Sequence, residues 1–548
     1  MYCRRQASMK EIRSISPIFT FLVLIALSLI FGLIAIPSGR AIQLTAWASL
    51  FTLPVLLPIQ NKATRKWIFP ILFLGFSILF IDFGIRGFLY HMYEASPTSA
   101  FVIESLLNTN QNESFEFFQA NSIEILCWIA ISFTFIALIT LILLYWVKAK
   151  SISFSHPKTT YALFIFFICF IVASWVIKPW RAHLPPMEWV NVASKIESLR
   201  ADWNSITEEI AQEGNAAGQH ITKLHHEAET IVLVIGESIN RDNMSLYGYA
   251  RDTTPRLKAE SKKPGFFYAK EAWSTRSSTV EAFHSMFSFA LDQHDKVNHG
   301  NVFAFFQKAG WYIEWISNQD DLAIKSEYAS WAKNDLFLNR AGGRTSNSMD
   351  EKVLVPLKEA LNNPAPKKLI IVHLIGIHPN YSLRSPSDYS VHWSDEDTVS
   401  TQLKEKDRSL RTQIARNDYD RAMLYQDKIL TETLELTQKA SENQSVLWLF
   451  LSDHGNETGN CLDRTGHSPV TLSGYKIPFM LWASPKFTKQ EDLQHLPQEF
   501  RADWLSEMLF DAAGIHWKNS NPTRSILESN YQYQEPEIIS SLKKRPCS

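Results

Sequence analysis

The sequence predicts a transmembrane domain of five helices followed by an α/β domain outside the membrane. Apolar runs dominate the first 180 residues, whereas the remainder has the composition of an ordinary globular protein. Lys and Arg are concentrated in alternate loops between the apolar runs. Beyond Glu229, short β-branched runs alternate with helical stretches, which is typical of a sheet covered by helices on both faces.

Five stretches are long and apolar enough to cross a bilayer as helices. They are Pro17–Ile36, Ala41–Ile59, Trp67–Tyr90, Ile125–Val147 and Tyr161–Ile177. We interpret the first as a span, because no small-residue cleavage site follows it. In the third, Asp82 and Arg86 are four residues apart, which favours an ion pair near the outer interface over contact with a lipid headgroup.

Loop charge predicts the orientation of these spans. Lys and Arg precede the first span and occur between spans two and three and between spans four and five. The loop His91–Asn121, after span three, has neither. Because cytoplasmic loops are enriched in these residues, the N-terminus is predicted to lie inside. With five spans, everything after Trp180 then lies outside.

We therefore expect three parts: residues 1–180 in the membrane, a bridge over 181–228, and an outer domain over 229–548. Pro185–Pro186 breaks the chain after the fifth span. Trp180, Trp189 and Trp203 predict amphipathic helices that lie at the membrane surface in this bridge.

Charge and cysteine content exclude other classes of protein. With 54 Lys and Arg against 55 Asp and Glu, the chain lacks the basic excess of a nucleic-acid binder. The five cysteines form no Cys-x-x-Cys pair, which argues against a thiolate zinc site. A disulfide between Cys461 and Cys547 stays open, because the sequence does not set the distance between them.

The outer domain contains four apolar runs that we interpret as buried strands. They are Thr230–Ile235, Lys368–Leu374, Val446–Leu451 and Ile477–Trp482. In sheets covered on both faces, ligands bind beyond the carboxyl ends of the strands. The residues that follow each run are therefore the first candidates for a functional site.

Carboxylates and imidazoles follow three of these strands. Glu237 follows the first, His378 follows the second, and Asp453 and His454 follow the third, with His467 a short loop later. This set of ligands suits zinc, with manganese a poorer match. Each motif alone is more typical of a capped turn. Their agreement at one edge of the sheet is what predicts a metal site.

A nucleophile is expected in the segment Trp273–Phe287, which offers several hydroxyl groups just before a helix. Thr279 is a natural N-cap, with the helix starting at Val280. A hydroxyl at a helix N-terminus lies where backbone N–H groups favour an anionic phosphate. A divalent metal would lower the pKa of that hydroxyl and polarise a phosphoryl group.

Several longer motifs carry a resemblance to a known family. They are Val234–Leu257 (VIGESINRDNMSLYGYARDTTPRL), Trp315–Gln319 (WISNQ), Tyr419–Asp427 (YDRAMLYQD), Leu451–Gly455 (LSDHG) and Tyr475–Trp482 (YKIPFMLW). In these motifs the chain resembles the phosphoethanolamine transferases of Gram-negative bacteria, within the alkaline phosphatase and sulfatase-like superfamily. The resemblance covers nearly the whole chain.

The resemblance implies a fold and a function. The fold is a five-helix transmembrane domain joined to an α/β sulfatase/alkaline-phosphatase-like periplasmic catalytic domain over residues 229–548. The function is zinc-dependent transfer of phosphoethanolamine from phosphatidylethanolamine, through a phospho-threonine-type intermediate. The acceptor is a cell-envelope glycolipid, either lipopolysaccharide lipid A or a core sugar. The protein is expected in the bacterial inner membrane.

The resemblance also implies roles for single residues. It makes Glu237, Asp453, His454 and Thr279 the metal ligands and Thr279 the nucleophile, placed by its spacing from Met286–Phe287.

Four further residues match positions at the family's substrate. His378 and His467 match histidines that bind a second metal or the substrate phosphate. Thr109 and Glu113 match residues that face the donor headgroup.

The acceptor and the exact reaction stay open. Where the family's lipid A branch has Asn, Ser and Lys, this chain has Ser105, Asp320 and Ala323, and it has few cysteines. The low cysteine content is more similar to branches that modify core sugars or periplasmic glucans, or to branches of unassigned acceptor. A manganese-dependent phosphoglycerol transferase is the rival enzyme. A non-catalytic membrane sensor is disfavoured, because such a protein would first lose its metal ligands.

Overall fold

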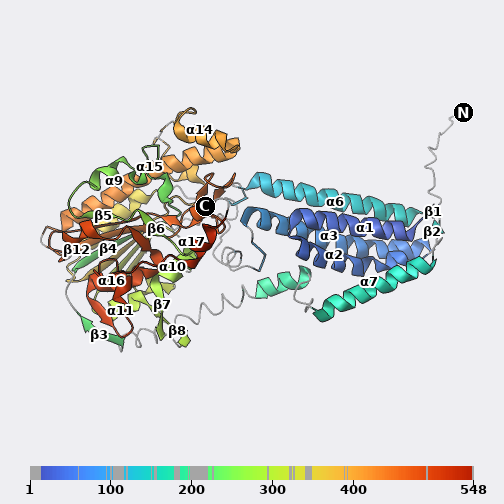
Figure 1. Ribbon diagram of the computed structural model, residues 1–548, viewed down its shortest axis with the longest axis horizontal. Helices are drawn as coiled ribbons and strands as arrows, with labels where there is room; N and C mark the ends of the chain where they lie inside the picture. The colour runs from blue at the N-terminus through green and yellow to red at the C-terminus, as the bar shows by residue number, and fades with distance from the viewer. Residues whose placement is uncertain are drawn as a thin grey trace. The chain divides into compact units, whose positions relative to one another are not determined.

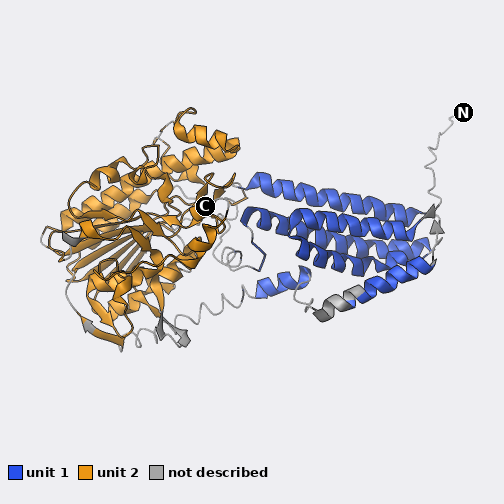
Figure 2. Ribbon diagram, viewed as in Figure 1, with its two compact units in different colours: residues 1–107, 121–199 blue, residues 108–120, 200–548 orange. Residues whose placement is uncertain are grey.

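The computed structural model divides into two compact units (Figure 2). Unit 1 comprises residues 1–107 and 121–199, and unit 2 comprises residues 108–120 and 200–548. The described residues are 14–57, 59, 61–93, 95–98, 102, 117–118, 121–149, 151–152, 157–177, 185–194, 197, 220–224, 228–292, 295–319, 324, 327–339, 348–387, 389, 391, 393–442, 444–488 and 491–545.

Unit 1 is a bundle of long helices that correspond to the predicted apolar stretches. They are α1 (Pro17–Ala35), α2 (Ser38–Thr52), α3 (Lys62–Tyr93), α6 (Ser122–Lys148) and α7 (Pro157–Ile177), and the 3-10 helix η1 (Leu53–Leu56) continues α2. Of the described helices, α1, α3 and α6 are long and apolar enough to cross a membrane. Within α7, a shorter segment, Lys158–Cys169, is apolar.

Polar side chains satisfy backbone groups at the ends of two of these helices. The hydroxyl of Ser16 accepts a hydrogen bond from Phe19 N at the start of α1, which satisfies one of the N–H groups left free at a helix N-terminus. Arg65 is fully buried and donates to the carbonyl oxygens of Trp146 and Ala149, at 2.5 and 2.7 Å. A buried cation therefore neutralises the C-terminal end of α6.

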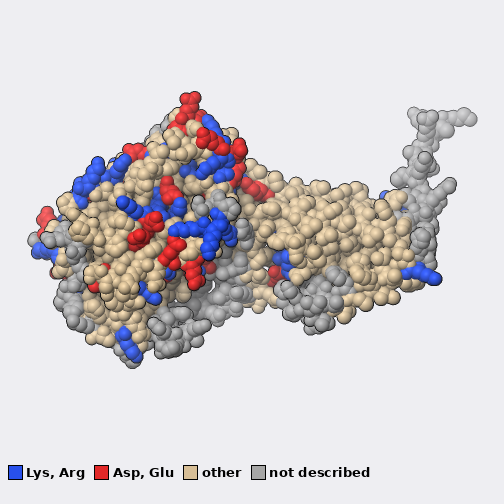
Figure 3. Space-filling view, in the orientation of Figure 1, with Lys and Arg blue, Asp and Glu red and all other residues tan. Residues whose placement is uncertain are grey.

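Glycines allow α3 and α6 to approach closely. A Cβ at Gly84 would lie 2.3 Å from Ser132 Oγ, and one at Gly87 would lie 2.3 Å from the Trp128 ring. Small residues at such contacts let apolar helices pack backbone to backbone in a membrane. On the outside of the unit large apolar side chains are exposed, Trp67 by 79%, and the face drawn in Figure 3 carries few charged side chains.

Buried charges connect α2 and α3 with the helical residues 185–194. Arg86 donates to Asp82 at 2.6 Å and to Glu188 at 2.7 Å, so the predicted ion pair is confirmed. Arg40 also donates to Glu188 at 2.7 Å, and Trp189 Nε1 donates to Asp82 Oδ1 at 2.9 Å. The bridge segment is thus held to the bundle by paired charges. Trp180 and Trp203, the other two tryptophans predicted to lie at the membrane surface, are outside the described residues.

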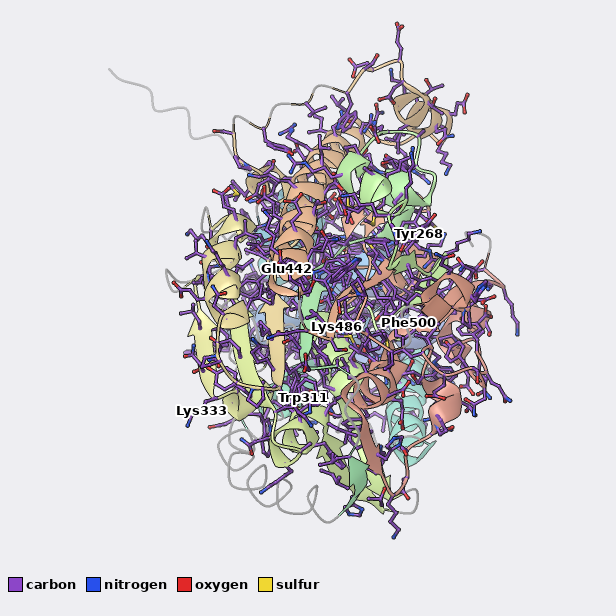
Figure 4. The ribbon with its side chains drawn as sticks, turned by 90° about the vertical axis from the view of Figure 1, so that its left-hand side faces the viewer. Tyr268, Trp311, Lys333, Glu442, Lys486 and Phe500 are labelled. Carbon is purple, nitrogen blue, oxygen red and sulfur yellow. The ribbon has the colours of Figure 1, made fainter. Side chains whose placement is uncertain are left out.

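Unit 2 is built on a seven-stranded sheet in the order β10-β9-β11-β4-β12-β16-β5. The strands are β4 (Thr230–Gly236), β5 (Phe266–Tyr268), β9 (Tyr312–Ser317), β10 (Asn334–Phe337), β11 (Lys368–His373), β12 (Val446–Ser452) and β16 (Phe479–Ala483). The five strands from β10 to β12 are parallel. In Figure 4, Lys333 beside β10 and Tyr268 in β5 lie on opposite sides of the view, where the two edge strands run.

Helices cover both faces of this sheet, as predicted (Figure 1). Side chains of β4 alternate between two cores: Val232 and Val234 pack with α9, α13 and α15, whereas Ile231, Leu233 and Ile235 pack with α10, α11 and α16. This alternation follows from the two-residue period of a strand. Since both faces are buried, the strand reads as a continuous apolar run. The helices are α9 (Pro255–Glu260), α10 (Thr279–Phe287), α11 (Val302–Lys308), α13 (Leu354–Leu361), α14 (Thr398–Glu405), α15 (Leu410–Ala440), α16 (Leu505–Ala513) and α17 (Glu537–Leu542).

The remaining strands form small sheets. β15 (Lys476–Ile477), β6 (Glu271–Trp273) and β17 (Glu499–Arg501) form one sheet. The two-stranded sheets are β1 (Ser14–Ile15) with β2 (Ser151–Ile152), β3 (Ile221–Leu224) with β18 (Ile515–Trp517), β7 (Ser288–Asp292) with β8 (Asp295–Asn301), and β13 (Glu457–Thr458) with β14 (Thr465–Gly466).

The prediction of one continuous strand over Ile477–Trp482 was wrong. The run Ile477–Trp482 is divided at Pro478 into the end of β15 and the start of β16, which belong to different sheets. Proline has no N–H group to donate to a neighbouring strand, so the ladder is interrupted there. In addition, β16 runs antiparallel to β12.

Candidate active site

The predicted site residues follow three adjacent strands at one edge of the sheet. Glu237 follows the central strand β4 directly. Asp453 and His454 follow β12 on one side of β4, and the turn with His378 follows β11 on the other. Parallel strands end at the same edge, so the fold itself brings these side chains together.

Thr279 lies against the first of these carboxylates. Its hydroxyl donates to Glu237 Oε2 at 2.8 Å, across 42 residues of sequence. The predicted N-cap was wrong by one residue, because Ser278 has the extended backbone of the cap and Thr279 is the first residue of α10. The Ser278 hydroxyl donates to Glu281 at 3.2 Å. The Thr279 hydroxyl is consequently directed at Glu237 instead of capping the helix.

Two carboxylates and an imidazole are buried together without a full set of hydrogen bonds. His454 Nε2 is 3.4 Å from Glu237 Oε1 and 3.5 Å from Asp453 Oδ2, and all three side chains are fully buried. Among the described residues, neither Asp453 Oδ2 nor His454 Nε2 has a hydrogen-bond partner. Buried polar atoms are rarely left so unless something else binds them.

The charges of this cluster shift the pKa values of its members. Burial, together with the negative charge of Glu237, raises the pKa of Asp453 to about 7. For His454, burial acts to lower the pKa, but the carboxylates of Asp453 and Glu237 outweigh it and raise it to about 9. Two carboxylates buried this close together favour either a proton on one of them or a cation beside them.

The tautomer of His454 is suited to a metal. Its Nδ1 lies 2.8 Å from the carbonyl oxygen of Gly455, so in the neutral ring Nδ1 carries the proton and donates. Nε2 then keeps its lone pair, directed toward the carboxylates. This is the usual arrangement for a histidine that ligates a metal.

The other two histidines extend the cluster toward solvent. The donor atoms of Glu237, His454 and His467 all lie within 4.8 Å of one another, which is compatible with a single ion. The side chain of His467 is 20% exposed, and its ring is 4.5 Å from that of His454. His378 lies one ring further out, 6.0 Å from His467 between centroids. The donor atoms present therefore fit a divalent cation.

Three supporting residues received no role in the sequence analysis. Gln319 donates to the carbonyl oxygen of Leu374 at 2.6 Å and lies 3.4 Å from Glu237 Oε2. Ser238 bonds to both carboxylates. Asp350 accepts from the backbone N–H groups of the turn after β11. Gln319 and Ser238 lie in motifs shared with the family, and this could have marked them as site residues. Nothing in the sequence marks Asp350 as one.

Other predicted residues are not tested by the geometry. Thr109 and Glu113, expected at the donor headgroup, lie outside the described residues. Cys461 is disulfide-bonded, whereas Cys547 lies outside the described residues.

Comparison with known proteins agrees with the family resemblance described from the sequence. Residues 229–515 match the profile of the Sulfatase family. The chain is 28% identical over 489 residues to phosphoethanolamine transferase EptC of Escherichia coli K12, covering 82% of this chain and 81% of that protein. It is 27% identical over 478 residues to phosphoethanolamine transferase CptA of Salmonella typhimurium, covering 81% and 80%.

Solved structures match both parts of the fold. A zinc complex of the C-terminal periplasmic domain of Escherichia coli EptC covers 57% of this chain and 91% of its own, with 29% identity and a TM-score of 0.53. The integral membrane protein lipooligosaccharide phosphoethanolamine transferase A of Neisseria meningitidis covers 94% of this chain and 98% of its own, with 17% identity and a TM-score of 0.54. At that identity the second match shows the fold alone. Together the matches confirm the predicted family resemblance and two-part fold.

Proposed function

This chain belongs to the sulfatase family, and on that premise we propose that it is an inner-membrane phosphoethanolamine transferase with Thr279 as its nucleophile. One observation carries the proposal. The Thr279 hydroxyl lies 2.8 Å from Glu237, in a cluster that also contains the buried Asp453 and His454 and the partly exposed His467. A neutral threonine is a poor nucleophile, and this group is what can activate it.

We propose zinc as the metal, held by Glu237, Asp453, His454 and Thr279. The buried atoms without hydrogen bonds, Asp453 Oδ2 and His454 Nε2, support this. A set of carboxylate and imidazole ligands suits zinc, and the zinc complex of the related EptC domain supports the same choice. When bound, the ion lowers the pKa of the Thr279 hydroxyl and polarises the phosphoryl oxygens.

The proposed reaction has two steps. In the first, Thr279 Oγ1 bonds to the phosphorus of phosphatidylethanolamine, the bond from phosphorus to the glycerol oxygen breaks, and diacylglycerol leaves with a proton. In the second, an acceptor oxygen bonds to that phosphorus, loses its proton and releases Thr279 Oγ1. His378 and His467 lie at the open side of the cluster, where they can exchange protons with the leaving and entering oxygens.

The membrane unit fits a lipid donor. Diacylglycerol and its parent phospholipid both remain in the bilayer, so an enzyme anchored there meets its donor without extracting it. We propose five spans, with the N-terminus inside and unit 2 in the periplasm, supported by the loop charges and the apolar helices. Thr109 and Glu113, in the loop after the third span, keep their proposed place at the donor headgroup.

For the acceptor we propose an envelope glycolipid, either lipid A or a core sugar of lipopolysaccharide. The relatives named above are phosphoethanolamine transferases, which supports this proposal. A periplasmic glucan is the alternative acceptor.

Two experiments test the proposal. Mass spectrometry of envelope glycolipids from cells with and without the gene should show the gain of one phosphoethanolamine unit, which identifies the acceptor. With labelled phosphatidylethanolamine, Thr279→Ala should lose transfer. Thr275→Ala is the matched control, because Thr275 is in the same segment but its hydroxyl donates to Ser285, at 3.3 Å, and not to Glu237. Equal activity in the two variants would contradict the assignment of the nucleophile.

A further inference from the structure

Ser238 has a backbone conformation that serine seldom adopts. Its φ is 61°, in the left-handed region, and among the described residues only Asn380 and Asp407 share a positive φ without being glycine. Asn and Asp tolerate this region, whereas other side chains crowd the backbone there. Ser238 is also fully buried. Such strain persists only where surrounding contacts enforce it, and it is frequent at functional sites.

The left-handed conformation lets one residue bond to two carboxylates from different strands. The Ser238 hydroxyl donates to Glu237 Oε1 at 2.8 Å, and the Ser238 N–H donates to Asp453 Oδ1 at 3.1 Å. Glu237 follows β4 and Asp453 follows β12, 215 residues from Ser238 in the sequence. Ser238 therefore joins the two strand ends at the point where the acidic side chains meet.

These bonds leave one oxygen of Asp453 available and fix the orientation of the Glu237 carboxylate. Asp453 Oδ1 accepts from Ser238 N and from His454 N, the latter at 2.7 Å. Oδ2 is left facing His454 Nε2 at 3.5 Å. In Glu237, Ser238 occupies Oε1 and Thr279 occupies Oε2, so both oxygens are fixed in place. Hydrogen bonds of this kind orient metal ligands and tune their affinity.

Tyr419, on helix α15, stabilises the left-handed backbone of Ser238 through two hydrogen bonds. The Tyr419 hydroxyl donates to the carbonyl oxygen of Ser238 at 2.7 Å and accepts from Asn240 N at 2.8 Å. Tyr419 is fully buried on α15 and packs edge-on against Tyr381, with ring centroids 5.0 Å apart. One phenol therefore bonds to the backbone on both sides of Ile239 and keeps Ser238 in its strained conformation.

We propose that Ser238, held by Tyr419, is a positioning residue that orients Glu237 and Asp453 toward the divalent metal. This inference rests on the proposed function, because it concerns the same metal site. Ser238 itself neither binds the metal nor touches the substrate. Its hydroxyl acts through Glu237 and its N–H through Asp453.

The test measures metal affinity of the full-length protein in detergent, with Zn²⁺ competed against a chelator. Ser238→Ala removes the hydroxyl and should lower Zn²⁺ affinity by about 10–100-fold. Ser238→Thr keeps the hydroxyl and should retain wild-type affinity in the folded fraction, although a β-branched side chain fits the left-handed region less well than alanine. A purely structural role predicts the opposite order of the two variants.

A matched control is available at Ser484. Like Ser238, Ser484 is buried and its hydroxyl is hydrogen-bonded: it donates to the carbonyl oxygen of Gln444 at 2.9 Å and accepts from Val446 N at 2.9 Å. Val446 begins β12, so Ser484 lies at the end of that strand opposite Asp453. Ser484→Ala should leave Zn²⁺ affinity unchanged. Tyr419→Phe, which removes the bond to Ser238 O and keeps the ring, should lower it as Ser238→Ala does.

A second readout is the visible absorption spectrum of the Co²⁺-substituted protein, which reports ligand geometry. The spectrum of Ser238→Ala should differ from wild type, whereas that of Ser484→Ala should not. Wild-type affinity and spectrum in Ser238→Ala and Tyr419→Phe would overturn the inference and leave the proposed function intact. Equal losses in Ser238→Ala and Ser238→Thr would overturn the role of the hydroxyl. A wild-type protein that binds no metal would overturn both the inference and the proposed function.

Discussion

The turn after β11 lies in direct backbone contact with Glu237, and Gly376→Ala is the change that tests this contact. Gly376 has φ +57°, and a Cβ there would lie 2.5 Å from Glu237 O and 2.6 Å from Glu237 N. Ile377 N also donates to Glu237 O at 2.9 Å. Because backbone cannot rotate away as a side chain can, an added methyl group must displace either the turn or Glu237, a ligand of the proposed metal site.

The expected cost has two parts. Placing alanine in the left-handed region costs about 1–2 kcal/mol. Overpacking a closely packed contact costs about 1–3 kcal/mol more. Gly310→Ala is the matched control, because Gly310 has φ +80° but no atom within 4 Å of the added Cβ. The two variants share the first cost, so their difference isolates the contact with Glu237 at about 1–3 kcal/mol.

The assay is chemical unfolding of both variants in detergent, followed by tryptophan fluorescence, together with transfer from phosphatidylethanolamine. Gly376→Ala should unfold at lower denaturant concentration than Gly310→Ala. It should also lose transfer, since Glu237 moves, while Gly310→Ala keeps it. Equal stability and equal activity in the two variants would refute the argument that the turn fixes Glu237.

Three further predictions concern the membrane, the donor and pH. A phosphatase reporter fused after Trp180 should be active and one fused after Lys66 inactive, and the reverse pattern would place unit 2 in the cytoplasm. Glu113→Ala should impair transfer from a lipid donor more than cleavage of a small soluble phosphodiester; equal losses would indicate a structural role. Burial raises the pKa of Glu507 from 4.5 to about 7, so the folded state holds a proton that the unfolded chain releases, and stability falls as pH rises between those values. Glu507→Gln should therefore raise the free energy of unfolding by roughly 1–3 kcal/mol at about pH 8 and leave it unchanged at about pH 4, whereas an equal gain at both pH values would contradict this account.

Elements with a strong local signal were predictable from the sequence. The run Ile125–Val147 became the core of α6, and Thr230–Ile235 became the central strand β4. Length and continuous apolarity decide both cases, since a strand buried on two faces needs no polar positions. The same reasoning failed at Ile477–Trp482, because a break at Pro478 and the antiparallel direction of β16 depend on partner strands elsewhere in the chain.

The sequence predicted which residues lie at the strand ends of the candidate site, but not which side chains are in contact there. Glu237 and Asp453 could be placed at one edge, because each directly follows an apolar run. The left-handed backbone of Ser238 could not, since it depends on a bond from Tyr419, 181 residues away. The start of α10 at Thr279 was likewise missed, because serine and threonine are both good caps and only tertiary contact with Glu237 decides between them.

The most direct test of the central claim is detection of a covalent intermediate on Thr279. The full-length protein is incubated with phosphatidylethanolamine and no acceptor, then digested and analysed by peptide mass spectrometry with fragmentation to localise any adduct. A phosphoethanolamine group on Thr279, absent from Thr279→Ala, is the predicted result. An adduct on Thr275, Ser277 or Ser278 would show that the nucleophile is misassigned, and an active Thr279→Ala enzyme without any adduct would contradict the two-step mechanism.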